Sequence, residues 1–430
     1  MPRKMKDSGI EWIGEIPESW QVVRHKHVMH KEKMICAHYD GEDIISLTMN
    51  GVIIRDLDAG GKMPTSFDGY QYVEPQNLLL CLFDIDVTPR CVGLVKNAGV
   101  TSPAYSRFIV HKGYYNAYYD YLLRTIDDKK VFVHLSKNLR SSLTENDFGA
   151  LPTVAPPFEE QFRIASYLDT KCAKIDAVLE QTRNSIEEYK KLKQSVITQE
   201  VTKGIRPGRK MKDSGIEWIG EIPEEWDTPK ILHCLQMPIT DGPHTTPELF
   251  DEGIPFISAE AVSAGNGKID FEHMRGYISS DFYDECCKKY IPQIDDIYMI
   301  KSGATTGRVA IVDTSATFTI WSPLAAFRSD KNVMLPLFLF YSLQSDYIQK
   351  QIENGWTYGT QQNIGMRTLE KMKICVPNTS EQNEIIGHLN ENTARIDEII
   401  QKKQQFLTEL ESYKKSLIYE CVTGKREVTG

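Results

Sequence analysis

The stretch KMKDSGIEWIGEIPESW at residues 4–20 recurs as KMKDSGIEWIGEIPEEW at residues 210–226, and the two copies differ only where Ser19 is replaced by Glu225. A match of this length does not arise by chance. Internal self-similarity is typical of chains that use one structural unit more than once. We therefore predict that a single architectural plan is used twice, and we call the two copies the heads.

A second repeat lies in two long segments, residues 158–203 and 379–421, where for example Gln161 recurs as Gln382. Neither segment contains proline, although proline precedes each of them, and both are rich in Glu, Lys, Gln, Leu and Ile. These residue types favour helix, and a preceding proline is typical of a helix entrance. Each segment is therefore predicted to form one long helix.

Apolar residues recur at heptad-like spacing in both long helices, and such a seam must be covered by another element. The simplest prediction is that the two helices pair with each other as a coiled coil. A two-fold arrangement of the repeats would make the pair antiparallel and place the intervening segments at opposite ends. The alternative is two independent core helices in two ordinary domains. The expected seam residues are Leu168, Ile175, Leu179, Ile186, Leu389, Ile396, Ile400 and Leu407.

The repeats divide the chain into six segments. These are a head at 1–20, body one at 21–155, a long helix at 156–209, a head at 210–226, body two at 227–376 and a long helix at 377–430. The predicted fold class is α/β (α+β): two mixed, strand-rich domains separated by two long helices that form an antiparallel coiled coil, in a pseudo-two-fold internal repeat. Thr379 or Ser380 is the expected N-cap of the second helix.

Strand-like runs and turn signals alternate through both bodies. In body one, residues 43–48 and 51–55 flank an Asn-Gly turn and predict a hairpin, and 114–126 predicts a helix. In body two, 335–352 predicts a helix. Further strands are expected at 77–83, 91–96, 107–111, 254–258, 297–300, 308–312 and 317–321.

Composition bounds the class of protein. The longest apolar runs fall far below the roughly 18 residues of a membrane span, and the N-terminal residues do not resemble a signal peptide. We therefore expect a cytoplasmic protein without a membrane partner. Nine cysteines occur without a C-x-x-C pair, a pattern that favours reduced thiols and no metal site.

The formal net charge of −9 argues against a simple DNA-binding protein. Binding to DNA would then need local basic clusters, or a basic partner that supplies part of the phosphate contacts. Basic, amide and hydroxyl side chains near predicted loops are the candidates, because they can hydrogen-bond base edges or phosphates. They are Arg90, Lys96, Tyr105, Arg107, Lys137, Asn138 and Arg140 in body one, and His244, Thr245, Thr246, Lys301, Ser302, Thr305, Thr306, Arg308, Gln361, Gln362, Asn363 and Arg367 in body two.

Some short motifs bear on whether the chain could catalyse a reaction or bind phosphate. APPF at 155–158 resembles the catalytic motif of adenine methyltransferases, but Ala155 offers no hydrogen-bonding group, and the chain has no glycine-rich loop suited to S-adenosylmethionine. KSGATTGR at 301–308 lacks the Gly-Lys-Ser/Thr ending of a P-loop, and it fits either phosphate contact or a structural turn. His244 lies in DGPHTTP at 241–247, which fits DNA contact or a plain turn. No catalytic residue is predicted.

Taken together, these motifs resemble the specificity subunits of type I restriction–modification systems over almost the whole chain. GIEWIGEIP at 9–17 with its second copy, PFEEQ at 157–161 and SEQ at 380–382 carry the resemblance, together with the Ile-Asp pairs inside the helices. DGPHTTP resembles a motif of one class of recognition domain. Body one instead carries ISL, GVIIR and SPAY, which resemble another class, so the two half-sites are expected to differ.

The resemblance implies a function that the spacing alone does not. Each body would be a target recognition domain for one half of a split site in double-stranded DNA, and the paired helices would set the spacer. Two methyltransferase subunits would dock on the helices and heads, and restriction–translocation subunits would complete the enzyme. S-adenosylmethionine, ATP and magnesium would belong to those partners, and this chain would hold no cofactor.

Two other functions remain open at this point. A protein-binding scaffold with duplicated bodies would suit the negative charge. A self-sufficient DNA methyltransferase would need the acceptor residue and the cofactor loop that the motifs lack.

Overall fold

The computed structural model describes residues 3–49, 51–58, 64–88, 90–136, 142–358 and 362–429. It divides into two compact units. Unit 1 comprises Met1–Arg183 with Gln405–Gly430, and unit 2 comprises Asn184–Gln404. The division crosses both long helices, so each unit contains one head, one strand-rich body and part of each long helix.

Body one contains two four-stranded sheets. In the antiparallel sheet the order is β4 (Met29–Lys31), β11 (Ser106–Val110), β8 (Leu78–Leu80) and β9 (Val92–Leu94). In the second sheet the order is β6 (Gly51–Ile54), β5 (Ile44–Thr48), β10 (Gly99–Thr101) and β7 (Gln71–Val73), and β5 and β10 run parallel. The predicted hairpin is confirmed, because β5 and β6 pair antiparallel.

A helix packs against the antiparallel sheet of body one. The predicted helix at 114–126 is observed as α1 (Asn116–Asp128), which packs against β9 and buries Tyr118, Leu122 and Leu123. Two short helices follow, α2 (Val131–Leu135) and α3 (Glu145–Ala150).

Body two repeats this plan with different residues. Its antiparallel sheet has the order β15 (Thr240–Asp241), β21 (Leu324–Phe327), β18 (Ile297–Ile300) and β19 (Val309–Ile311). A second sheet has the order β17 (Tyr277–Ile278), β16 (Ile254–Ile257) and β20 (Thr319–Ile320), and again one strand pair, β16 with β20, is parallel. The antiparallel sheets therefore share one strand order, while the second sheet of body one has an additional strand, β7, that has no counterpart among the described residues of body two.

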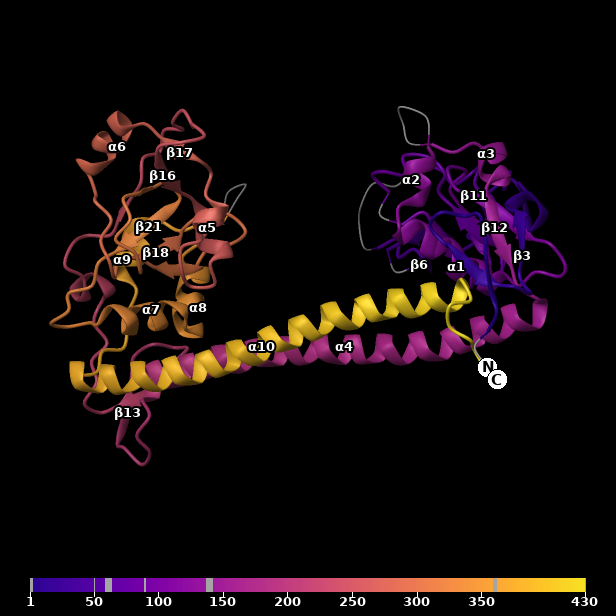
Figure 1. Cartoon of the computed structure of the whole chain (residues 1–430). Helices are drawn as coiled ribbons and strands as arrows, with labels where there is room; N and C mark the ends of the chain where they lie inside the picture. Colours follow the sequence, from indigo (N-terminus) through magenta and orange to yellow (C-terminus); the bar gives the residue numbers. More distant parts are fainter. Residues whose placement is uncertain are drawn as a thin grey trace. The chain divides into compact units, whose positions relative to one another are not determined.

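The helices of body two include one correction. One helix was predicted over 335–352, but the structure has α7 (Pro336–Gln344) and α8 (Asp346–Asn354). They are separated by Ser345, which has an extended ψ of 150°. The Ser345 hydroxyl donates to the Ser342 carbonyl, and the Asp346 N–H donates to Thr198 on the long helix, so contacts distant in sequence end α7. Both helices lie between the β18–β21 sheet and the long helices (Figure 1). The remaining helices are α5 (Ala259–Ala264), α6 (Ser280–Cys287) and α9 (Met366–Lys371).

The two heads fold identically. Strands β1 (Met5–Asp7) and β2 (Glu15–Pro17) pair antiparallel in the first head, and β13 (Met211–Asp213) and β14 (Glu221–Pro223) pair in the same register in the second. The buried Trp20 indole N–H donates to Glu160 at 3.0 Å, and Trp226 donates to Glu381 at 3.2 Å. Each head is therefore joined to the start of a long helix by the same buried hydrogen bond.

A repeated strand pair and a repeated glutamine attach each body to its helix. Strand β3 (Gln21–Arg24) pairs with β12 (Pro152–Ala155) in unit 1, and bridges from Asp227 to Val376 and from Lys230 to Lys373 take its place in unit 2. Gln161 accepts from the Tyr115 N–H at 2.8 Å, and Gln382 accepts from the Leu335 N–H at 2.7 Å. The contacts that hold the bodies are thus kept, although the bodies themselves differ.

Both long helices are confirmed, as α4 (Phe158–Lys203) and α10 (Thr379–Val422). The expected N-cap at Thr379 or Ser380 is wrong: the Asn378 side chain accepts from the Glu381 N–H at 3.0 Å, so both expected caps lie inside the helix.

The helices run antiparallel in each unit. In unit 1, Asp176 pairs with Lys414 and Arg183 with Glu411, so residue numbers rise along α4 as they fall along α10. In unit 2, Lys193 pairs with Asp397 and Glu200 with His388 in the same sense. The expected seam residues are buried at Leu168, Leu179, Ile186, Leu389 and Ile396, and half-buried at Ile175, Ile400 and Leu407.

Candidate nucleic-acid interface

Loops from distant parts of body two meet at one end of its antiparallel sheet. The loop at 301–308 follows β18, and strand β23 (Gln362–Asn363) lies against it. The Gly303 N–H donates to the Gln362 carbonyl at 3.0 Å, and the Ile364 N–H donates to the Lys301 carbonyl at 2.9 Å. The structure therefore brings together two groups of predicted residues that are about 60 positions apart in the sequence.

The DGPHTTP loop at 241–247 joins the same cluster. The Asp241 carboxylate lies 2.6 Å from the Lys301 ammonium, 2.5 Å from that of Lys289 and 3.2 Å from His244 Nε2. Burial opposes ionisation of Asp241, but hydrogen bonds from Lys289 and Lys301 outweigh it and hold the pKa of this carboxyl below its usual value. Asp241 thus remains a carboxylate that organises three basic groups.

The 241–247 loop passes so close to the end of β20 that position 242 has no room for a side chain. A Cβ at this position would lie 2.0 Å from the Ile320 carbonyl oxygen, which is far below van der Waals contact. The close approach lets the Ser322 N–H donate to the Pro243 carbonyl at 3.3 Å. The loop is therefore held against the end of β20, and His244 projects from it with 72% of its side chain exposed.

The predicted residues of body two differ in what they present to solvent. Lys301 is only 8% exposed and its ammonium group is paired with Asp241, so little of its charge is available to a ligand in solvent. Half-buried positions are Ser302, Thr305 and Thr306, and the Thr306 hydroxyl closes a turn on the Gly303 carbonyl. The exposed positions are His244, Thr245, Thr246, Arg308, Gln362, Asn363 and Arg367.

In body one, Lys96 is exposed in the loop between β9 and β10, while Arg90 and Tyr105 are half-buried. The SPAY turn is held by Gln71, whose amide donates to the carbonyls of Ser102 and Tyr105 at 3.1 and 2.7 Å.

Arg107 is an inward-facing residue of β11. It is 3% exposed, and its Nε donates to Asn77 at 2.6 Å. This burial argues against a contact with DNA and favours a structural role. Of the other predicted positions, Lys137, Asn138, Arg140 and Gln361 lie outside the described residues.

One basic residue at this surface was not predicted. Lys289 follows α6, and about half of its side chain is exposed while it pairs with Asp241. With Asp241, His244, Thr245 and Tyr290 it lines a cavity of about 350 Å³. The adjacent lysines at 288 and 289 were the available sequence signal, but nothing local indicates that one of them reaches the 241–247 loop.

The arrangement suits hydrogen bonding to a polyanion better than catalysis. Exposed arginine, hydroxyl and amide groups stand together on loops over a rigid sheet, which is how proteins contact phosphates and base edges. Within the described ranges, no cluster of three or more His, Cys, Asp or Glu side chains could hold a metal ion. In the same part of the chain, no helix is long and apolar enough to cross a membrane.

Comparisons with known proteins agree with this geometry. Residues 237–409 match the family model described as type I restriction modification DNA specificity domain. Over 313 residues the chain is 28% identical to the protein named for the MjaX type I restriction enzyme specificity subunit of Methanocaldococcus jannaschii, covering 72% of this chain and 67% of that protein. It is 23% identical over 282 residues to the EcoBI specificity subunit of Escherichia coli, covering 63% of this chain and 57% of that protein.

Solved structures share the fold over nearly the whole chain. A chain from a structure on complex assembly and conformational transition of the type I R-M system aligns with a TM-score of 0.70 at 15% identity, covering 96% of this chain and 99% of that one. The HsdS subunit from Thermoanaerobacter tengcongensis aligns with a TM-score of 0.51 at 16% identity, covering 96% and 98%. At these identities the likeness shows the fold.

The chain thus has a duplicated fold, and residues 237–409 in its second half are similar to the DNA specificity domain of type I restriction–modification systems. Nearly the whole chain shares its fold with the two solved structures, and its relatives of similar sequence are specificity subunits of type I restriction enzymes.

Proposed function

We propose that this chain is the sequence-reading subunit of a type I restriction–modification enzyme and that it recognises a bipartite DNA site. One observation carries the proposal: the antiparallel sheets of both bodies have the same strand order, and both bodies have the same attachment to a long helix, yet they present different loops. One scaffold that displays two different surfaces is suited to reading two different half-sites.

We propose further that catalysis belongs to partner subunits. Ala155 is the last residue of β12, and Gln161 donates to the Pro156 carbonyl at 2.8 Å, so the APPF segment forms the entrance to α4. Two methyltransferase subunits would bind S-adenosylmethionine and methylate adenine, and restriction–translocation subunits would use ATP and magnesium. The assembly would act on DNA in the cytoplasm.

The negative charge of the chain fits this division of labour. Phosphate neutralisation supplies much of the affinity of a DNA-binding protein. A chain with a net charge of −9 gains that affinity when basic partner subunits complete the contact with the duplex. Base reading would remain with the exposed loops of the two bodies.

Mapping of N6-methyladenine in genomic DNA tests the proposal, with this chain present or absent and its methyltransferase partner supplied. The expected result is a split motif that depends on the chain, and that changes in one half when residues 21–155 are replaced by another body. An unchanged methylation pattern, with the partner expressed and bound, would instead support a protein-binding scaffold. Methyl transfer by the isolated chain would support a self-sufficient methyltransferase.

A further inference from the structure

Arg275 of body two is held in place on two sides. It lies just before β17, and its guanidinium carbon is 4.4 Å from the centroid of the Trp321 ring. Its Nη2 donates to Glu260 Oε1 at 3.1 Å. One face of the guanidinium is therefore covered by an aromatic ring and one edge is paired with a carboxylate, which together restrict its orientation.

The aromatic ring beneath Arg275 is itself fixed. Trp321 follows β20, and its backbone N–H donates to the Ile257 carbonyl at 2.8 Å. Its ring packs on the buried Phe256 ring, with the centroids 6.0 Å apart. The indole N–H has no hydrogen-bond partner among the described residues, so packing holds this side chain. Trp321 thus forms a firm platform for the guanidinium.

The neighbours of Arg275 belong to the candidate interface. Ser322, the residue after Trp321, donates its N–H to the 241–247 loop at 3.3 Å. Helix α5, which carries the carboxylate that pairs with Arg275, also accepts a hydrogen bond from Arg308 Nη1 at 3.3 Å. Arg275 is therefore part of the same surface as the exposed loops of body two.

The carboxylate beside Arg275 affects which ligand it suits. Burial opposes ionisation of Glu260, but hydrogen bonds from Ser258 and Arg275 hold the pKa of this carboxyl below its usual value. The group is thus a carboxylate that offsets the positive charge of the guanidinium. It would repel a phosphate at the same place, whereas the edge of a base carries no net charge. The pair therefore favours a base over the DNA backbone.

The donors left on Arg275 match one base. Among the described residues only Glu260 hydrogen-bonds its guanidinium, and 45% of the side chain is exposed, so the Nε and Nη1 groups are available. Two parallel arginine donors fit O6 and N7 of guanine in the major groove, and no other base offers two acceptors there. A guanidinium oriented in advance loses less conformational freedom when it makes this contact.

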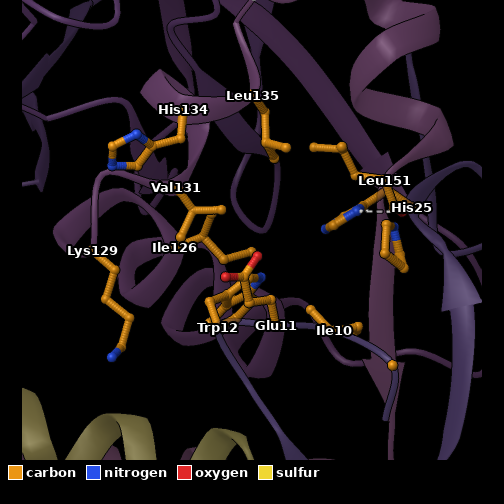
Figure 2. A pocket seen from close by; sticks show the side chains of 12 residues that line it. Ile10, Glu11, Trp12, His25, Ile126, Lys129, Val131, His134, Leu135 and Leu151 are labelled. Atoms are coloured by element: carbon orange, nitrogen blue, oxygen red, sulfur yellow. Dashed lines mark hydrogen bonds between the residues drawn. The ribbon is translucent and has the colours of Figure 1, made fainter.

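A cavity of about 680 Å³ in unit 1 offers a comparison. Figure 2 shows Trp12 and Glu11 together at its wall, with Lys129 also lining it. The Lys129 ammonium, however, stacks on Tyr419, 4.2 Å from the centroid of that ring. A tryptophan and a glutamate near a basic residue are therefore not enough to fix a cation, and the arrangement around Arg275 does more.

Body one has a different residue at the position of the platform. Thr101 and Trp321 both directly precede a Ser-Pro pair. Thr101 is fully buried, and its hydroxyl donates to the Ile45 carbonyl at 2.7 Å. It offers no ring on which a guanidinium could stack, so the arrangement is a property of body two.

We infer that Arg275 reads a guanine in the half-site of body two, with Trp321 and Glu260 as the residues that position it. This inference rests on the proposed function, which makes DNA the ligand. The contact runs from the guanidinium to O6 and N7 of the guanine in the major groove. Arg275 is then a residue that determines specificity, rather than one that only attracts the DNA backbone.

The methylation map provides the first test. The half of the split motif that changes when residues 227–376 are exchanged is the half read by body two. We expect this half-site to contain a specified G·C pair. A half-site without one would overturn the inference and leave the proposed function intact. The absence of any motif that depends on the chain would count against the proposed function itself.

A guanine analogue tests the contact directly. The complex of the full chain with its methyltransferase partner is bound to duplexes in which 7-deazaguanine replaces one guanine of the half-site at a time. The analogue keeps base pairing but lacks the N7 acceptor. At one position it should weaken binding by the unmodified complex roughly tenfold. Arg275→Ala should weaken binding to the natural duplex by a similar factor and bind both duplexes equally.

Two further variants separate base reading from charge. Arg275→Lys keeps the positive charge but not the parallel donors, so it should be as insensitive to the analogue as Arg275→Ala. Lys268→Ala changes an exposed lysine of the same body that is paired with Asp313 at 2.7 Å, and it should keep the full sensitivity.

The analogue experiment on the unmodified complex needs no substitution, so it remains decisive if Arg275→Ala lowers stability. Equal binding of the unmodified complex to every substituted duplex would overturn the inference. So would an Arg275→Ala complex that still loses affinity with the analogue at each position where the unmodified complex does.

Discussion

The ammonium group of Lys193 lies 2.7 Å from both carboxylate oxygens of Asp397. Lys414 makes the same two-oxygen contact with Asp176 at 2.6 and 2.7 Å. Each pair joins a residue of α4 to a residue of α10, one pair in each unit. The apolar seam alone tolerates a shift by one heptad, whereas opposite charges at defined positions favour a single register.

Charge reversal at one pair tests this role. Lys193→Asp places two carboxylates together and should lower stability, by about 1 kcal/mol because the pair is partly exposed. Combination with Asp397→Lys should restore most of the loss. Thermal unfolding of the single and the double variant measures both changes in stability. Lys190→Asp is the control, because Lys190 belongs to an exposed ion pair within α4. A double variant no more stable than Lys193→Asp would show that the pair does not set the register.

The hydrogen bond from each buried tryptophan to its glutamate should be measurable. Trp226→Phe keeps the ring packing but leaves Glu381, which is 1% exposed, with only its remaining partners. We expect a loss of about 1–2 kcal/mol, the usual range for a buried hydrogen bond to a charged group. Trp20→Phe should cost a similar amount through Glu160. Urea unfolding measures both, and an unchanged midpoint for either variant would contradict the assignment.

Burial of His25 predicts a pH dependence. Its pKa is lowered from 6.5 to about 4, so the unfolded chain binds a proton more readily than the folded chain between these values. Stability from this group is complete above pH 6.5 and falls as the pH drops toward 4, by up to roughly 3 kcal/mol. His25→Ile, which introduces the residue found at the equivalent position 231, should remove this part of the acid sensitivity. Unfolding midpoints at several pH values for both chains compare the slopes, and identical slopes would refute the prediction.

The exposed arginines of body two should contribute to DNA binding by the assembled enzyme. Arg308→Ala and Arg367→Ala are expected to weaken binding several-fold at moderate salt. Lys268→Ala serves as the control, because Lys268 is exposed in the same body but is paired with Asp313 at 2.7 Å. The affinity of each variant complex for DNA is measured at several salt concentrations and compared with that of the unmodified complex. If an arginine variant binds like the unmodified complex at every concentration, that arginine does not contact DNA.

Lys301 should behave differently from these arginines. Because it is buried against Asp241, Lys301→Ala should destabilise unit 2, by about 1–3 kcal/mol for a carboxylate left without one of its partners. The affinity of the remaining folded protein for DNA should change little. Thermal unfolding and binding measured on the same sample separate the two effects. A large loss of affinity for DNA at unchanged stability would instead indicate that Lys301 contacts DNA.

Regular, local patterns made much of the fold predictable. The bounds of α4 were predicted because 46 consecutive residues lack proline and keep a heptad-like seam. The β5–β6 hairpin was predicted from its turn. The break at Ser345 was not, since no glycine or proline marks it and Thr198, which binds the next N–H, is far away in the sequence. Local signals indicate where an element can form, and distant contacts determine where it stops.

The candidate site shows the same limit. Loops rich in glycine and threonine indicated where His244 and Arg308 lie, and both are exposed. The burial of Arg107 depends on Asn77, which is 30 positions away, and that of Lys301 depends on Asp241, which is 60 positions away. The sequence shows which residues carry a charge, but it does not show which distant residue pairs with that charge and buries it.

The repeated heads also bear on how such a gene can change. Because residues 4–20 and 210–226 are almost identical, recombination between the stretches that encode them would delete one body with one long helix and keep the reading frame. The shortened product would retain the buried tryptophan, the glutamine attachment and half of the seam. With no second helix in the same polypeptide, that seam would favour association with another copy, so a heritable change of specificity would follow from a single deletion.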